Sequence, residues 1–223
     1  MSYMATNTVT IDVGGTFYNS LSDFGLAINN TDYIGDAVQG EAMAWAPGRS
    51  GPLDFIDGVF GGQYYLYREI VIKFGGLQEP EDWDAWISNF RDILDGRWIK
   101  IYFATDIEWY YQGRASVRNF SHKRALGTFE LHLPYADPFK HRDRSISFAS
   151  TAIGKIVNLS NKWERVVPTI TTDASVVVTL GNTTKTLAAG THQDPDFTLS
   201  AGVHQMSFVG AANVSVSYRE GSL

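Results

Sequence analysis

The chain has 223 residues, 24 acidic and 18 basic side chains, a formal net charge of −6 and 44% hydrophobic residues. This composition is too apolar and too weakly charged for a disordered chain, and the acidic balance excludes nucleic-acid binding through overall charge. Cysteine is absent, which excludes disulfide scaffolds, thiolate metal sites and cysteine nucleophiles. The 30 Trp, Tyr and Phe residues and 21 glycines favour a protein rich in strands and turns.

The first regular patterns along the chain are those of strands. Residues 9–28 alternate apolar and polar side chains with a break at Gly14-Gly15, which predicts short strands. The segment WAPGRSGP over 45–52 contains Pro-Gly and Ser-Gly-Pro steps, which predict tight turns. Aromatic and β-branched residues over 64–76 then predict one long strand.

The segment 79–96 has the pattern of an amphipathic helix, with Pro80 suited to its first turn. Acids at its start, among them Asp82 and Asp84, suit the positive end of the helix dipole, and Gly96 suits a left-handed residue at its end. The apolar residues that share one face are Trp83, Trp86, Ile87, Phe90, Ile93 and Leu94.

Strand patterns follow the helix to the end of the chain. Residues 97–103 predict one strand, and residues 106–120 and 126–135 predict a strand pair with Phe129, Leu131 and Leu133 on one face. Beyond residue 150, short Val- and Thr-rich runs separated by Gly-Asn, Ala-Gly and Asp-Pro turns predict a small β-sandwich.

These elements predict a mainly β chain of two domains. The expected first domain, residues 1–140, is a β-sandwich-type domain with one amphipathic helix over 80–95. The expected second domain, residues 141–223, is a β-sandwich. The boundary is placed where prolines, a charged cluster and small residues follow one another after Pro134.

No pattern in the sequence indicates an active site. The five histidines have no metal-ligand spacing, and neither a G-x-S-x-G nucleophile motif nor a phosphate-binding glycine loop is present. The acids at the helix start resemble the paired catalytic carboxylates of a hydrolase. The helix dipole explains their position better, because it favours negative charge at the first turn. We therefore expect no enzyme, no catalytic residue, no cofactor and no metal site.

Opposite charges gather in two segments. The helix segment 79–95 carries six acids and one arginine, whereas basic residues, including Arg114, Arg118 and Arg124, are concentrated over 114–144. Such segments suit a contact between subunits, in which Asp82 and Asp84 face these arginines. The alternatives for the basic segment are a solvated hairpin face and a strip that binds nucleic acid through interleaved Arg, Lys and aromatic side chains.

The order of several short motifs resembles the distal tail (Dit) proteins of siphophages. The motifs cover essentially the whole chain, and since each is short, their order and spacing carry the resemblance. They are FYNSLSDFGLAI at 17–28, PGRSGPLD at 47–54, YLYREIVIKF at 65–74, the helix ending in LDG at 94–96, Asp106 with GRA at 113–115, GTF at 127–129 through Pro134-Tyr135, and VN at 157–158 with PTI at 168–170.

This resemblance implies a structural virion protein at the distal end of the phage tail, made in the host cytoplasm. Members of the family form a hexameric ring hub that joins the tail tube to the tail tip or baseplate. The N-terminal domain, with an extended hairpin or arm, builds the ring, and the C-terminal domain is galectin-like.

The implied partners are other copies of the chain, the major tail tube protein above and a tail-associated tip or lysin protein below. Receptor-binding proteins can attach to the C-terminal domain, and DNA passes through the lumen without specific binding. No membrane contact is implied.

A carbohydrate-binding β-sandwich module that recognises cell-wall polysaccharide is the alternative function. Aromatic runs such as 64–67 and 109–111 can stack on sugars, although neighbouring residues of a strand face opposite sides. A β-sandwich hydrolase is a third class, for which no motif is present. The module predicts a monomer that binds polysaccharide, whereas the hub predicts an oligomer that binds proteins.

Overall fold

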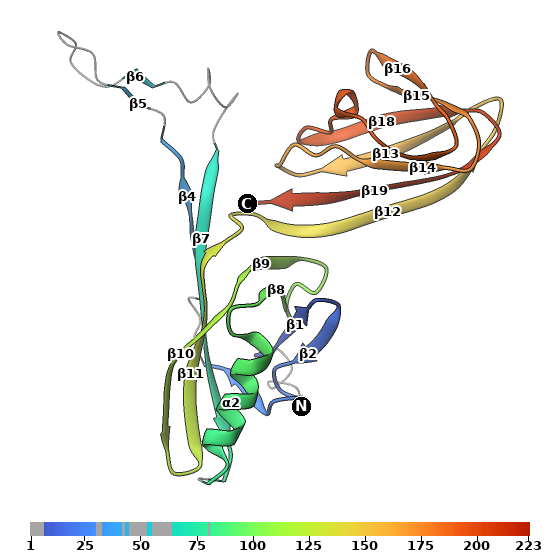
Figure 1. The fold of residues 1–223 in the computed structure, drawn as a ribbon. Helices are drawn as coiled ribbons and strands as arrows, with labels where there is room; N and C mark the ends of the chain where they lie inside the picture. Colours follow the sequence, from blue (N-terminus) through green and yellow to red (C-terminus); the bar gives the residue numbers. More distant parts are fainter. Residues whose placement is uncertain (1–6, 30–32, 42, 45–52, 55–63, 80) are drawn as a thin grey trace. The chain divides into compact units, whose positions relative to one another are not determined.

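The computed structural model describes residues 7–29, 33–41, 43–44, 53–54, 64–79 and 81–223 (Figure 1). The chain divides into two compact units, Met1–Pro138 (unit 1) and Phe139–Leu223 (unit 2). The turns predicted over 45–52, and Pro80, lie outside the described residues.

Unit 1 contains a first antiparallel sheet with the strand order β2-β1-β8-β9. Its strands are β1 (Val9–Val13), β2 (Thr16–Asn19), β8 (Trp98–Phe103) and β9 (Tyr110–Arg114). The break predicted between the first strands is confirmed, because Gly14 and Gly15 form the turn with φ of +62° and +93°. A side chain at either position would strain this backbone.

The second sheet of unit 1 is also antiparallel, with the order β10-β11-β7-β3, and β4 pairs with another part of β7. Its strands are β3 (Leu26–Ile28), β4 (Ile34–Gln39), β7 (Tyr65–Leu77), β10 (Ser116–Lys123) and β11 (Leu126–Ala136). A short separate pair joins β5 (Met43–Ala44) to β6 (Leu53–Asp54). The predicted long strand is therefore β7, and the predicted apolar face of β11 is buried at Phe129, Leu131 and Leu133.

The expected strand pair after the helix was partly wrong. Residues 116–123 pair with β11 as predicted, but residues 110–114 form β9 and pair with β8 in the first sheet. The chain changes sheet at Ala115, which is buried and exchanges backbone hydrogen bonds with Gly96 and Arg97. The helix terminus and this crossing point thus hold each other in place.

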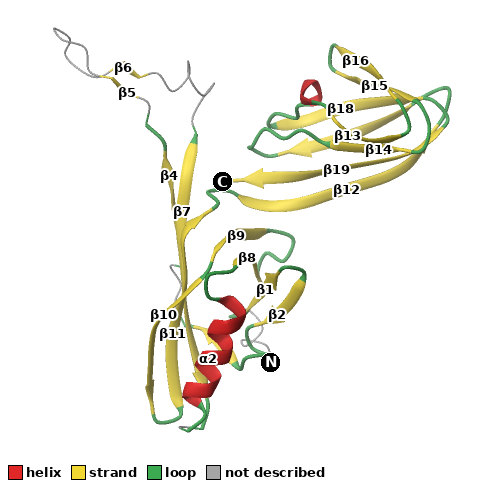
Figure 2. Ribbon diagram, viewed as in Figure 1, coloured by secondary structure: helices red, strands yellow, loops and turns green. Residues whose placement is uncertain are grey.

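The helix α2 spans Trp83–Leu94 and is the one α-helix among the described residues (Figure 2). It begins later than the predicted residue 80 because the backbone N–H of Asp82 bonds the carbonyl of Glu79 in a turn. Its predicted apolar face is confirmed, since Trp83, Ile87, Phe90 and Leu94 are buried. The left-handed end is also confirmed, because Gly96 has a φ of +71°.

Aromatic side chains hold α2 on the sheet. Phe90 packs edge-on against Phe129 of β11 and Phe24, with ring centroids 4.8 and 4.9 Å apart. Trp83 is fully buried and covers Gly127, where an added Cβ atom would overlap the indole ring. Glycine at 127 is therefore what allows the tryptophan to lie on the strand.

Unit 2 consists of two antiparallel sheets with orders β17-β14-β19-β12 and β13-β18-β15-β16. The strands are β12 (Lys140–Ser150), β13 (Lys155–Asn161), β14 (Thr169–Thr172), β15 (Val176–Leu180), β16 (Thr183–Leu187), β17 (Gly190–Gln193), β18 (Gly202–Val209) and β19 (Ala212–Ser222), with a 3-10 turn η1 at Pro195–Phe197. Their core includes Val178, Met206 and Phe208 from one sheet and Val214 and Val216 from the other. The predicted mainly β fold is confirmed for the described part of the chain.

Candidate functional site

The two acids predicted to make a subunit contact lie at the start of α2. Asp82 is the N-cap residue, but it has a helical backbone and its carboxylate makes no capping hydrogen bond. Asp84 lies in the first turn, and both side chains are exposed. Both carboxylates lie where the helix dipole favours negative charge, and Asp82 does so without capping the helix.

The three predicted arginines lie on β9, on β10 and in the turn after β10. Arg114 ends β9, and its Nη1 donates to the Gly96 carbonyl at 2.6 Å. Arg118 lies on β10, where its Nε donates to Ser116 Oγ at 3.1 Å. Arg124 lies between β10 and β11 with a φ of +55°, and all three side chains are exposed.

The five candidate residues keep their charges available to other molecules. Among the described residues, none of them forms an ion pair. The two charged segments are also neighbours, because α2 contacts β10 and Trp83 packs near Phe120 and His122 with ring centroids 5.8 and 6.3 Å apart. The structure therefore brings the acidic helix and the basic strand together within unit 1.

A surface cavity of about 400 Å³ adds a feature that the sequence did not indicate. Arg114 and Arg118 line it together with Tyr135, a residue that is 71% exposed and whose ring packs edge-on against the Tyr67 ring, with centroids 5.0 Å apart. Arg and Tyr are enriched where proteins meet. The pairing of β11 with β7 is irregular between Leu133 and Ala136, so simple alternation does not predict the exposure of Tyr135.

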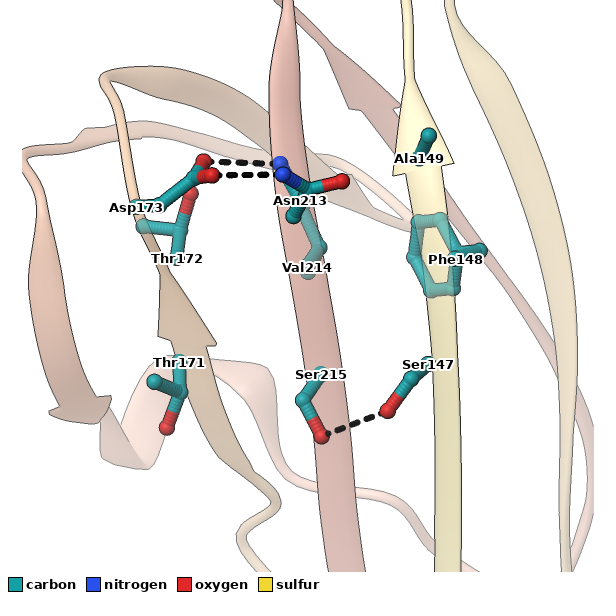
Figure 3. Close-up of a pocket in the computed structure, with 9 residues that line it drawn as sticks. All are labelled: Ser147, Phe148, Ala149, Thr171, Thr172, Asp173, Asn213, Val214 and Ser215. Atoms are coloured by element: carbon teal, nitrogen blue, oxygen red, sulfur yellow. Dashed lines mark hydrogen bonds between the residues drawn. The ribbon is translucent and has the colours of Figure 1, made fainter.

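A second cavity, of about 590 Å³, lies over β12, β14 and β19 in unit 2 (Figure 3). Small polar side chains line it, including Ser147 and Ser215, whose hydroxyl oxygens are 3.2 Å apart. Its one aromatic lining residue, Phe148, is half-buried and packs edge-on against Phe208 of the core at 5.0 Å. The cavity therefore has no exposed ring on which a sugar stacks.

Asp173 and Asn213 close one end of this cavity. The Asp173 carboxylate accepts hydrogen bonds from the backbone N–H of Asn213 at 2.7 Å and from its side-chain amide at 2.6 Å (Figure 3). These bonds favour the charged carboxylate and hold the pKa of Asp173 below its usual value, the side-chain bond having the larger effect.

Removing the Asn213 side chain is expected to raise the pKa of Asp173 toward its ordinary value. The amide bond is lost in Asn213→Ala, whereas the backbone bond remains. A carboxyl pKa that is lowered in the folded state stabilises the fold at pH values above the unfolded-state pKa. This stabilisation is lost as the pH falls through the folded-state pKa. At neutral pH, Asn213→Ala is therefore expected to be less stable than the unmodified chain. An NMR pH titration of Asp173 measures the shift, with Thr171→Ala as the control. An unchanged pKa in Asn213→Ala would contradict the assignment.

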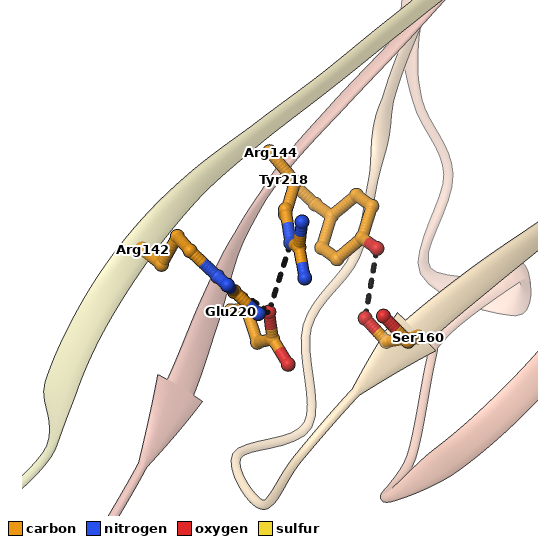
Figure 4. Close-up of polar contacts among 5 residues, drawn as sticks. All are labelled: Arg142, Arg144, Ser160, Tyr218 and Glu220. Atoms are coloured by element: carbon orange, nitrogen blue, oxygen red, sulfur yellow. Dashed lines mark hydrogen bonds and ion pairs between the residues drawn. The ribbon is translucent and has the colours of Figure 1, made fainter. Parts of the chain in front are cut away.

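Unit 2 also contains a buried ionic cluster that sequence reasoning missed (Figure 4). Glu220 is 1% exposed, and one of its oxygens, Oε2, accepts hydrogen bonds from both Arg142 and Arg144. The distances are 3.1 and 2.8 Å to Nε and Nη2 of Arg142 and 3.0 Å to Nε of Arg144. Beside them, Tyr218 donates to the Ser160 carbonyl at 2.8 Å, and burial raises the pKa of this tyrosine.

Asn161, the last residue of β13, has a structural role. Asn161 is 3% exposed, and its amide donates to the carbonyls of Leu199 and Ser200 at 3.0 and 3.3 Å. Its side chain therefore ties the end of β13 to the segment before β18. This arrangement does not present Asn161 to a ligand.

Two further kinds of feature to consider in the described residues are a metal-binding cluster and a membrane-spanning helix. No group of three or more His, Asp or Glu residues within it has an arrangement that holds a metal ion. No described helix is long and apolar enough to cross a membrane.

Comparisons with known proteins support the fold. No protein-family model and no curated protein matches the sequence. A solved structure with a similar fold is the crystal structure of the Dit protein of phage SPP1, presented there as a paradigm of the hub adsorption apparatus in phages that infect Gram-positive bacteria. The similarity covers 96% of this chain and 99% of that chain with a TM-score of 0.63 and 13% sequence identity. The similarity confirms the coarser expectation of a mainly β, Dit-like fold.

Proposed function

We propose that the chain is a structural distal tail protein of a siphophage. It forms a hexameric ring hub that joins the tail tube to the tail tip or baseplate, and it is not an enzyme. The observation that carries this proposal is the fold similarity to SPP1 Dit over nearly the full length of both chains. The order of the short motifs along the sequence is a second, independent support.

The two parts of the chain take different roles in this proposal. Residues 1–140 build the ring through a tube-like β-sandwich with α2 and a hairpin arm, and residues 141–223 form a galectin-like outer domain. The division into two compact units, each with its own buried core, supports separate roles.

The proposed hub lies at the distal end of the tail in the virion and is made in the host cytoplasm. Its partners are the tail tube protein above and a tip or lysin protein below, with receptor-binding proteins on the outer domain. DNA passes through the lumen without specific binding, which suits the net charge of −6.

Ring contacts are proposed between unlike faces of neighbouring subunits. A ring with head-to-tail contacts needs two complementary surfaces on each copy. Arg114, Arg118 and Arg124 of one copy supply the basic surface, and Asp82 and Asp84 of the next supply the acidic one. The support is that all five are exposed and form no ion pair among the described residues.

Charge reversal tests the hub and its contacts together. Light scattering after size exclusion, with negative-stain images, is expected to show a six-fold ring for the unmodified chain. The triple variant Arg114→Glu, Arg118→Glu and Arg124→Glu is expected to be a folded monomer, because like charges then face each other. Adding Asp82→Arg and Asp84→Arg to that variant restores the opposite signs and is expected to restore the ring.

The control reverses three exposed basic residues of unit 2, Lys155, Lys162 and Arg165, for the same change in net charge. A ring that survives in the triple variant would refute the contact but leave the hub intact. An unmodified chain that stays monomeric at all concentrations and binds cell-wall polysaccharide would favour the carbohydrate-binding module.

A further inference from the structure

A small cavity of about 200 Å³ opens on one side of unit 2, between β12 and β13. These are the last strands of their sheets within this unit. The cavity is lined by Arg144 and Ile146 of β12, by Asn158 and Leu159 of β13, and by Tyr218 of β19. It is separate from the polar cavity over β14 and β19.

One part of this cavity is apolar because the core is incompletely covered there. Ile146 pairs with Val216, a fully buried core residue, so it belongs to the face that points between the sheets. Nevertheless Ile146 remains 40% exposed. With buried Leu159 and the half-buried ring of Tyr218, it forms a surface that a small hydrocarbon group can cover.

The other part of the cavity carries an oriented positive charge. Arg144 pairs with Tyr218 across the strands, and its Nε donates to the buried carboxylate of Glu220 (Figure 4). Its two terminal nitrogens have no hydrogen-bond partner among the described residues, and the side chain is 38% exposed. Glu220 also accepts from Arg142, so Arg144 shares its counter-ion. The guanidinium is thus held in place with its outer donors unused.

We infer that this cavity binds a carboxylate that carries a small apolar group, with Arg144 as the residue that binds the carboxylate. A guanidinium presents paired N–H donors that match the two oxygens of a carboxylate. The apolar group covers Ile146 and Leu159. The C-terminal residue of a peptide, when it is aliphatic, has this combination. The inference concerns unit 2 and does not depend on ring formation.

The test uses the full chain with N-acetyl-L-leucine as the probe and N-acetyl-L-leucinamide as its uncharged match. NMR chemical shifts of the Leu159, Ser160 and Tyr218 amides and of Arg144 Nε are followed during titration. The acid is expected to shift these signals in a saturable way. The amide is expected to bind with an affinity at least roughly tenfold lower, because it cannot form the charge-assisted hydrogen bond with Arg144. Equal effects of acid and amide, or no saturable shift with the acid, would overturn the inference.

Three variants make the result specific. Arg144→Gln is expected to weaken binding of the acid roughly tenfold or more. Arg219→Gln removes one charge from the exposed Asp143 pair and is expected to leave binding unchanged. Ile146→Trp fills the cavity without changing its charge and is expected to abolish binding. Unaltered binding in either Arg144→Gln or Ile146→Trp, with the fold retained, would place the ligand elsewhere.

Discussion

Replacing Trp83 with alanine is expected to lower the free energy of unfolding of unit 1 by about 3–5 kcal/mol. Trp83 is fully buried, and its ring packs edge-on against Trp86 at 5.4 Å and lies against Phe120 and Gly127. Alanine leaves a cavity that Gly127 has no side chain to fill. The first turn of α2, which carries Asp82 and Asp84, loses its contact with the sheet.

Trp83→Phe is the matched control for this prediction. The indole Nε1 of Trp83 is buried without a hydrogen-bond partner among the described residues, so phenylalanine keeps an aromatic ring and removes an unsatisfied donor. Its cost is expected to be at most about half that of alanine, because a smaller void remains. Urea denaturation gives the free energies, and hydrogen exchange of α2 amides assigns the loss to unit 1. Equal losses in the two variants would show that ring packing is not what holds α2.

Local periodicity explains why α2 was predictable from the sequence. Trp83, Ile87, Phe90 and Leu94 repeat with helical spacing, and the structure buries all four. The start of the helix was less predictable, since acids at 79, 81, 82 and 84 favour the first turn at several positions. A turn hydrogen bond between Asp82 and Glu79 decides the start.

Sheet membership was not predictable where it depends on contacts distant in sequence. Strands β9 and β10 are separated by Ala115 alone, and their residue patterns look alike. They join different sheets because the Ala115 backbone pairs with the loop after α2. The strand pattern contains no signal for that contact, so the sequence predicts a single strand over residues 106–120.

The candidate site was predictable in its charges but not in its geometry. The exposed arginines and acids of unit 1 follow from composition along the chain, but the cavity beside Tyr135 depends on an irregular strand pairing. The burial of Glu220, in contrast, has a signal in the local pattern. Val214, Val216 and Tyr218 alternate on one face of β19, and Glu220 continues that alternation inward. Its partners lie 76 and 78 residues away and cannot be paired from local pattern.

Replacing Glu220 with glutamine is expected to lower the free energy of unfolding of unit 2 by about 2–3 kcal/mol. The change removes the negative charge that both Arg142 and Arg144 contact, and leaves two guanidinium groups close together. The cost stays below that of a fully buried pair because the arginine side chains are 17% and 38% exposed, and water screens them in part. The control is Asp143→Asn, which removes one partner of the exposed ion pair between Asp143 Oδ1 and Arg219 Nε, 3.6 Å apart. This substitution is expected to cost less than about 0.5 kcal/mol of unfolding free energy.

Arg144→Gln is expected to cost no more than about 1 kcal/mol, in contrast to Glu220→Gln. Glu220 keeps both hydrogen bonds from Arg142 when Arg144 is removed, so its buried charge stays paired. Urea denaturation of the two single variants measures this asymmetry. The comparison separates the role of Arg142 from that of Arg144. Arg142 alone suffices to neutralise the buried charge of Glu220. Arg144 then adds little to stability, as expected for a residue whose free donors serve a ligand. A loss in Arg144→Gln as large as that in Glu220→Gln would instead make Arg144 a structural counter-ion.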